Sequence, residues 1–114
     1  MAESETLEAA RLAHEALELA IRLSEAGSVA DAHIWLGRIA AAIGDNRTAD
    51  AEFVAAFDVL RVTDSSADRS SRAHALYAEI LESRGDLHGA LEQLKQAVAS
   101  GRAQSTARIS ATTA

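Results

Sequence analysis

Apolar residues recur along the chain at three- and four-residue spacing in five stretches, which are separated by glycines or by short polar segments. This spacing is typical of amphipathic α-helices, because one face of a helix returns every 3.6 residues. We therefore expect an all-α fold of antiparallel helical hairpins stacked as a short α-solenoid. The expected helices span residues 6–26, 29–43, 46–62, 69–84 and 87–100.

Glycines and short polar side chains mark where these helices are expected to end and restart. A glycine follows four of the apolar stretches, at Gly27, Gly44, Gly85 and Gly101, and a residue at positive φ ends a helix at little cost there. Side chains that suit a helix start follow, namely Ser28 with Asp31, then Asp45 with Asn46, then Asp86. Residues 102–114 lack apolar periodicity, so a disordered tail or linker is expected after a folded domain over 1–101.

A repeat emerges when Gly85 is placed on Gly44, a shift of 85 − 44 = 41 residues. Eight positions are then identical, which indicates a duplicated helical hairpin over 29–62 and 69–100. Two further pairs are similar in size, since Gly37 and Ala78 are both small and Phe53 and Leu94 are both large and apolar. The other seven identical pairs are Ala32/Ala73, His33/His74, Ile39/Ile80, Asp45/Asp86, Ala49/Ala90, Ala56/Ala97 and Arg61/Arg102.

The two hairpins carry the patterns Leu36-Gly37, Gly44-Asp45, Ala49, Phe53, Ala56 and Tyr77-Ala78, Gly85-Asp86, Ala90, Leu94, Ala97. This pattern resembles the tetratricopeptide repeat over residues 29–102. The resemblance implies that small residues at 37, 78, 49 and 90 let paired helices approach closely, that Phe53 and Leu94 fill the space beside them, and that Ala56 and Ala97 admit the next hairpin. The chain departs from the family in its period, which is 41 where about 34 is usual, and in having Arg61 and Arg102 where a proline is usual. A generic bundle of α-hairpins is the alternative.

The first helix predicts an uncovered edge. It repeats the second-helix spacing of the hairpins, so it resembles half of a further repeat, and a stack of this kind normally needs about three repeats. Its leucines spread over more than one face, whereas residues 87–100 form one stripe suited to a capping helix. We expect self-association or another domain of a longer parent protein to cover the first helix at Leu7, Leu12, Leu19 and Leu23.

Composition narrows the function classes. The chain has 27 Ala and 12 Leu among its 114 residues, and both residue types favour helices. It has no Cys and no Pro. Its net charge of −6 argues against direct binding of nucleic acid, and no apolar run approaches the length of a membrane span. Ten Arg against a single Lys favour a bacterial source, and an acidic start without a signal peptide predicts the cytoplasm.

Catalytic and metal-binding patterns are scarce. The four histidines show no metal-ligand spacing, and His33 and His74 are interpreted as packing residues because they are equivalent in the repeat. No nucleophile elbow or glycine-rich phosphate loop is present, and the carboxylates of the first helix suit its N-terminal dipole. We therefore expect a non-enzyme without a cofactor or metal.

The tetratricopeptide resemblance implies a concave groove lined by the first helix of each hairpin. Such a groove would hold a peptide of mixed charge, because it carries both arginines and carboxylates. The leading hypothesis is a protein-interaction or oligomerisation module, expected to be a dimer, from a bacterial signalling or transcription-control protein. The alternatives are a sensor that binds a small molecule or peptide between its hairpins and a small enzyme. The groove residues are Asp31, Ile34, Arg38, Ala41, Arg72, Ala75, Glu79 and Glu82.

Overall fold

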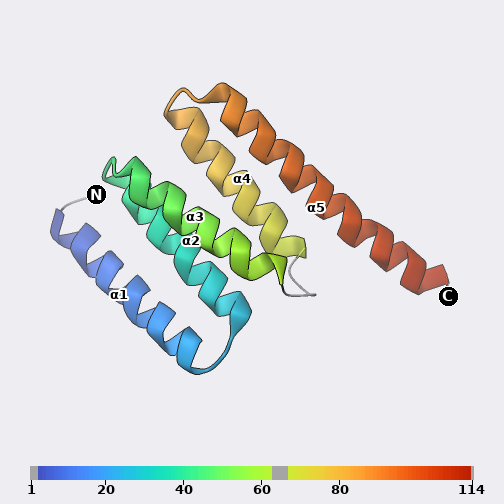
Figure 1. The fold of residues 1–114 in the computed structure, drawn as a ribbon, viewed down its shortest axis with the longest axis horizontal. Coiled ribbons are helices and arrows are strands. Elements are labelled where there is room, and N and C mark those ends of the chain that lie inside the picture. The colour runs from blue at the N-terminus through green and yellow to red at the C-terminus, as the bar shows by residue number, and fades with distance from the viewer. Residues whose placement is uncertain (1–2, 63–66, 114) are drawn as a thin grey trace. The chain divides into compact units, whose positions relative to one another are not determined.

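The computed structural model describes residues 3–62 and 67–113, with Glu3 and residues 102–113 described as backbone alone. The described residues form five α-helices, and neighbouring helices pair as hairpins, which confirms the predicted all-α fold (Figure 1). The chain divides into two compact units, Met1–Thr63 and Asp64–Ala114. The helices are α1 (Glu3–Arg22), α2 (Ala26–Ala42), α3 (Asn46–Arg61), α4 (Ala67–Ser83) and α5 (Leu87–Thr113).

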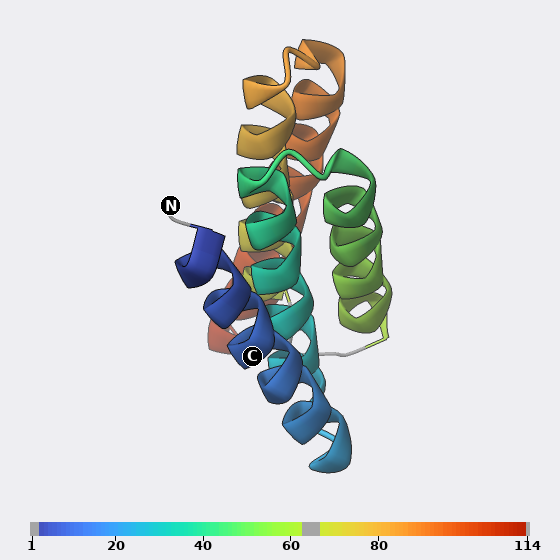
Figure 2. The ribbon, with the colours of Figure 1, turned by 90° about the vertical axis from the view of Figure 1, so that its left-hand side faces the viewer.

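The first unit is built around α2, which packs against α1 on one side and α3 on the other (Figure 2). A helix with two neighbours must bury a wide face, and α2 accordingly buries six of its residues. Most are small, so the three helices pack closely. The buried residues of α2 are Ala30, Ala32, Ile34, Leu36, Gly37 and Ala40.

The contact between α2 and α3 depends on Gly37 and Phe53. Phe53 is fully buried, and a Cβ atom placed on Gly37 would lie 2.8 Å from two carbons of its ring. The ring therefore occupies the space that a side chain at position 37 would fill. Ala49 and Ala56 are also fully buried on the same helix as Phe53, and the ring of Phe57 stands 6.2 Å away from that of Phe53. The predicted packing roles of Gly37, Ala49 and Phe53 are confirmed, while the contact of Ala56 with a next hairpin stays a prediction.

The second unit is the hairpin of α4 and α5. Ala78, Leu81 and Ala90 form its buried cluster, with Tyr77 packed against them. Ala73 and Ala97 are buried as well, and the hydroxyl of Ser71 donates a hydrogen bond of 2.9 Å to the carbonyl of Ala97. These contacts confirm the packing roles predicted for Ala78 and Ala90, while the contact of Ala97 with a next hairpin stays a prediction.

The turns of the two hairpins have the same conformation, as the 41-residue repeat predicts. Gly44 and Gly85 take φ values of 81° and 85°, which glycine adopts without the clash that a Cβ would cause. The amide after each glycine bonds back to the helix, from Asp45 to Ala40 and from Asp86 to Leu81, each at 2.9 Å. Such bonds satisfy carbonyls that the helix end leaves free.

The side chains that start the second helices are equivalent too. The backbone N–H of Thr48 donates to the carboxylate of Asp45 at 3.2 Å, and the N–H of Gly89 donates to that of Asp86 at 2.9 Å. Each carboxylate thereby accepts from one of the free amides of the first turn. Both restart signals predicted at these aspartates are confirmed.

The two equivalent histidines make equivalent contacts across their hairpins. The Nδ1 atom of His33 lies 2.8 Å from Oε2 of Glu52, and that of His74 lies 2.6 Å from Oε1 of Gln93. A carboxylate and an amide oxygen both accept, so each imidazole donates from Nδ1. Each histidine thus joins the first helix of its hairpin to the second.

The turn between α1 and α2 lies earlier than predicted. The helix ends at Arg22, Ser24 takes the positive φ of 55°, and the amide of Glu25 bonds to the carbonyl of Ala20 at 3.0 Å. Gly27 is therefore within the first turn of α2, where a glycine costs only about 1 kcal/mol relative to alanine. Ala20 and Ala30, which lie on either side of this turn, are both buried. The predicted cap at Ser28 is wrong, because α2 begins after Glu25.

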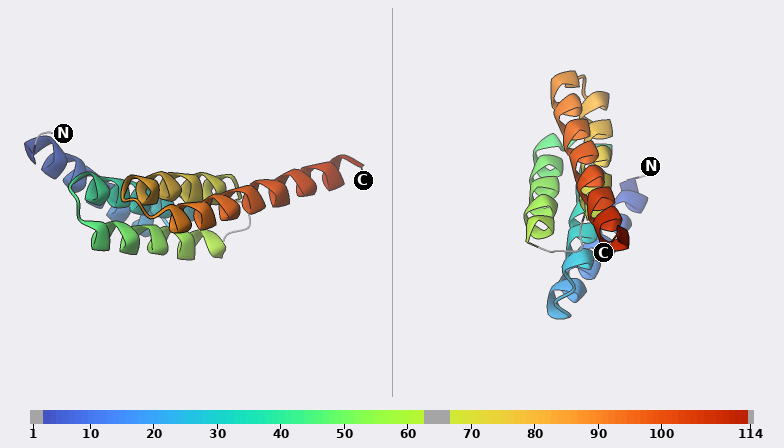
Figure 3. Two further views of the ribbon diagram at one scale, coloured as in Figure 1. Left: turned by 90° about the horizontal axis from the view of Figure 1, so that it is seen from above. Right: turned by 90° about the vertical axis from the view of Figure 1, so that its right-hand side faces the viewer.

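The last helix is longer than predicted. It passes through Gly101 and continues to Thr113, well beyond the start of α4 (Figure 3). A single glycine does not stop a helix when helix formers such as Arg102, Ala103 and Gln104 follow it and no proline intervenes. The predicted helix end at Gly101 is wrong, and residues 102–113, expected as a disordered tail or linker, are helical.

Leu94 does not take the buried position that Phe53 takes in the first hairpin. It is 46% exposed, whereas Phe53 is 0% exposed. At the facing position the second hairpin has Ala78 instead of Gly37, and the methyl group of an alanine occupies the space that the ring of Phe53 uses. The repeat-packing role predicted for Leu94 is therefore wrong.

Replacing Gly37 by Ala should lower the free energy of unfolding by about 1–3 kcal/mol, because the new Cβ overpacks the contact with Phe53. The double variant Gly37→Ala, Phe53→Leu copies the residue pair of the second hairpin. It should lose less than the sum of the two single variants, with a coupling of at least about 0.5 kcal/mol. Urea denaturation followed by circular dichroism measures all three, and strictly additive losses would contradict the contact.

Candidate functional site

The inner face of α1 attaches it to α2. Thr6 and Ala20 are buried, and Ala13 and Leu17 between them are half-buried. These residues are spaced by seven, four and three, which places them along one side of the helix. The repeat-like spacing predicted for α1 therefore corresponds to a packed face, and this face fixes the direction of every other side chain on α1.

A second apolar face of α1 is uncovered. Leu12 and Leu19 are each 51% exposed, Leu23 is 63% exposed, and Ala16 between them is exposed as well. Their spacing of four, three and four residues sets them in a row beside the packed face. We call Leu12, Ala16, Leu19 and Leu23 the α1 strip. Uncovered rows of this kind mark protein-interaction surfaces more often than isolated exposed leucines do.

Leu7 does not belong to this strip. It is 66% exposed, but Leu12 follows it five positions later, which places the two side chains about 140° apart around the helix axis. Ile21, which is also exposed, lies on the same edge as Leu7 because 14 residues are nearly four whole turns. The predicted association face of four leucines is therefore wrong at Leu7, while Leu12, Leu19 and Leu23 do share one face.

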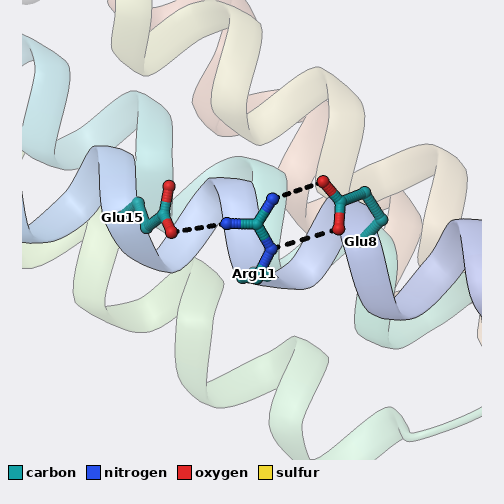
Figure 4. A network of polar contacts seen from close by, with 3 residues as sticks. All are labelled: Glu8, Arg11 and Glu15. Carbon is teal, nitrogen blue, oxygen red and sulfur yellow. Dashed lines mark hydrogen bonds and ion pairs between the residues drawn. The ribbon is translucent and has the colours of Figure 1, made fainter.

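A polar network runs along the outer side of α1. Arg11 donates two hydrogen bonds to the carboxylate of Glu8, one from Nη2 and one of 3.1 Å from Nε. Its Nη1 donates to the carboxylate of Glu15 at 2.6 Å (Figure 4). The hydrogen bond from Arg11, with its positive charge, lowers the pKa of the Glu8 carboxyl, and the two glutamates raise the pKa of Arg11. All three side chains are exposed, so the network orients charge beside the α1 strip and contributes little to stability.

The outer face of α2 carries three residues of one row, Asp31, Trp35 and Arg38. All three are exposed, and the guanidinium carbon of Arg38 lies 4.6 Å from the centre of the Trp35 ring, which is a cation–π contact. The sequence analysis missed Trp35, although its place four residues after Asp31 and three before Arg38 puts it on the same face. Exposed Trp and Arg side chains are the residues most enriched at the energetic centres of interfaces.

The predicted groove is only partly at the surface. Ile34 is buried in the first unit and Ala41 is half-buried, because both lie on the side of α2 that packs. Ile34 therefore cannot line a groove, and its assignment there is wrong. Asp31 and Arg38 remain as the exposed members of the first set.

The second set of groove residues lies on α4, in the other unit. Arg72, Glu79 and Glu82 are exposed and Ala75 is half-buried. Relative to α2, the charges are reversed at two equivalent positions, since Arg72 stands at the position of Asp31 and Glu79 at that of Arg38. The structure thus places each set along one helix and gives the two helices opposite charge patterns.

The α5 helix carries an apolar row that the sequence analysis expected to be buried. Leu87, Leu91, Leu94 and Val98 are all exposed, and we call them the α5 strip. The α5 helix meets α4 instead through Ala90 and Ala97, so its description as a simple capping helix is wrong. A shallow hollow on this strip is lined by residues of α5 alone.

The described residues also bear on metal sites and membrane spans. Within 4–62 and 67–101, no group of three or more His, Asp or Glu side chains is placed to hold a metal ion. Among the helices that the structure describes, none is both long enough and apolar enough to span a bilayer.

Replacing Arg11 by Gln should raise the pKa of the Glu8 carboxyl back toward the ordinary value for glutamate. The reason is that the hydrogen bond and the positive charge from Arg11 stabilise the ionised carboxylate. In the native chain this interaction is present above the ordinary pKa and is lost as the pH falls through the lowered one. Carboxyl titration by NMR measures the change, with Asp45 as the control, because Thr48 and not Arg11 lowers its pKa. An unchanged Glu8 pKa would contradict the network.

Comparison of the chain with models of protein families, with curated proteins and with solved structures finds no match. The resemblance to the tetratricopeptide repeat therefore rests on the residues of this chain.

Proposed function

We propose that this protein is a non-catalytic interaction module of the tetratricopeptide type, which self-associates through the α1 strip. The observation that carries the proposal is the row of Leu12, Ala16, Leu19 and Leu23, exposed on a helix whose other apolar side is already packed against α2. A water-soluble monomer gains nothing from three aligned and exposed leucines. Another helix laid along them removes their apolar surface from water.

The energy available from this strip indicates a reversible association. Fully burying a leucine is worth about 1.5–3 kcal/mol, so covering the exposed half of three leucines on each of two chains supplies roughly 5–9 kcal/mol. Association costs a comparable amount, about 4–15 kcal/mol in lost freedom of motion. The proposed dimer is therefore in equilibrium with its monomer at ordinary concentrations, as suits a regulatory contact.

Composition supports a setting for this module. The many alanines and arginines fit a bacterial protein, and degenerate repeats of this kind are typical of bacterial signalling and transcription-control proteins. We propose that the chain is the regulatory part of such a protein and acts in the cytoplasm without a cofactor or direct contact with nucleic acid. The exposed residues Trp35 and Arg38 on α2 supply a second surface, for a protein or peptide partner.

On this second surface, Trp35 and Arg38 favour a partner segment of mixed charge. Reversing Arg38 to Glu should weaken the binding of such a segment at least tenfold, because the variant loses a charge-assisted hydrogen bond to the carboxylates of the segment. Fluorescence of Trp35, the only tryptophan, reports binding when a panel of helical peptides with alternating acidic and basic residues is titrated. Equal affinity of the native and reversed proteins would remove this surface from the account.

The α1 strip itself is tested by the double variant Leu12→Glu, Leu19→Glu. The native chain should exceed its monomer mass of 12.0 kDa as concentration rises from the micromolar to the millimolar range. This variant should remain a monomer, because dimerisation would bury its new charges in the interface. Light scattering after size-exclusion chromatography measures both masses, and circular dichroism shows that the helices persist.

The matched control places the same substitutions on the α5 strip, as Leu91→Glu, Leu94→Glu. This control should associate like the native chain. A native protein that stays at 12.0 kDa throughout the series would overturn self-association. Loss of association in the α5 variant alone would overturn the choice of α1.

A further inference from the structure

The α1 strip extends into a longer seam with two alternating residue sizes. Ala9, Leu12, Ala16, Leu19 and Leu23 follow one another at spacings of three, four, three and four residues, which is the heptad spacing of helices that pair along their length. Ala9 is half-buried and the other four are exposed. Ala9 and Ala16 share one heptad position, which Leu23 takes next, and Leu12 and Leu19 share the other.

This alternation distinguishes between the two ways of pairing α1 with a second copy of itself. A parallel pair would set alanine against alanine and leucine against leucine, so that layers of two small and of two large side chains alternate along the seam. An antiparallel pair sets one leucine against one alanine in each central layer. Facing large and small side chains fill space evenly and let the helices approach closely.

We propose that the occupant of the α1 strip is a second copy of this chain, with the two α1 helices antiparallel. Leu12 then lies against the partner's Ala16, and Leu19 lies against the partner's Ala9. This inference rests on the proposed function, since it assigns the partner and orientation of the same surface. The seam ends where Leu23 meets the partner's Glu5, whose carboxylate reaches solvent at the rim.

The charges beside the seam favour the same orientation. Glu8, Glu15 and Arg22 recur every seven residues along the edge of the α1 strip that faces away from α2. An antiparallel pair places Glu8 opposite the partner's Arg22, and the two-fold symmetry makes this pair twice. The two Glu15 side chains approach each other at the centre, where Arg11 of each chain partly neutralises its own Glu15 through the 2.6 Å contact (Figure 4).

A parallel pair has no comparable charge partners. There the edge with Glu8, Glu15 and Arg22 would face the other edge of the seam, at Thr6, Ala13 and Ala20 of the second copy. Those residues are buried or half-buried in the first unit and carry no charge. Shape and charge therefore point to the same arrangement, although the chain as a whole carries a net charge of −6 that opposes self-association.

Disulfide cross-linking tests the orientation, and the natural chain has no cysteine to interfere. Two variants are prepared, Ala9→Cys and Leu19→Cys, one of them with a short tag so that mixed dimers separate on a gel. Under a mild oxidant the mixture should form cross-linked mixed dimers at least fivefold more than either variant forms with itself. A parallel pair predicts the reverse, because each cysteine would then meet its own copy.

Charge reversal tests the proposed ion pairs without touching the apolar seam. Arg22→Glu should weaken dimerisation about fivefold or more, since two attractive pairs become repulsive. Adding Glu8→Arg to the same chain should restore most of the affinity, because the pairs are then re-formed with exchanged signs. Sedimentation equilibrium gives the dissociation constants, and failure of the double variant to recover would overturn the assignment of Glu8 to Arg22.

These outcomes separate the inference from the function on which it rests. A native dimer in which Leu19→Cys links efficiently to itself keeps the proposed function and overturns the antiparallel arrangement. A native chain that is monomeric at every concentration overturns both.

Discussion

The close approach of two helices through small residues is the constraint on which the first hairpin depends. Gly37 presents no side chain to α3, so the ring of Phe53 lies directly on the backbone of α2 and is fully buried. The alanines on either side of Phe53 maintain the same spacing. The second hairpin keeps the alanines but has Ala78 at the position of the glycine, and its equivalent large residue, Leu94, is left half-exposed. The methyl group of Ala78 thus corresponds to an exposed Leu94 in the second hairpin, where the first hairpin has Gly37 and a buried Phe53.

Because the contact faces between the helices consist mostly of alanine, many of the larger apolar residues are exposed. The α1 strip and the α5 strip both consist of side chains beside a small-residue contact face rather than within it. In a longer array of hairpins, neighbouring helices would cover such rows. Here the rows stay uncovered within the described residues, and this is the physical basis for interpreting the protein as a module that binds other helices.

Much of this architecture follows from sequence patterns. Helical periodicity predicts all five helices, and the shift of 41 residues predicts the matched turns at Gly44 and Gly85, because both depend on local backbone preferences. The patterns fail where a contact overrides local preference. Ser24 takes a positive φ while Gly27 does not, and Ile34 is buried although its place in the repeat implied a groove. Trp35 was missed because the groove was defined by repeat position and not by the outer face of α2.

The candidate surface itself was predictable only in part. Excess leucine on the first helix indicates an uncovered edge, but only the direction of the packed face shows that Leu7 stands apart from Leu12, Leu19 and Leu23. The most direct test of the central claim is a dilution series followed by the methyl NMR signals of the leucines. We predict that the signals of Leu12, Leu19 and Leu23 shift with concentration while those of Leu91 and Leu94 do not. Concentration-independent signals from the α1 strip would contradict the account.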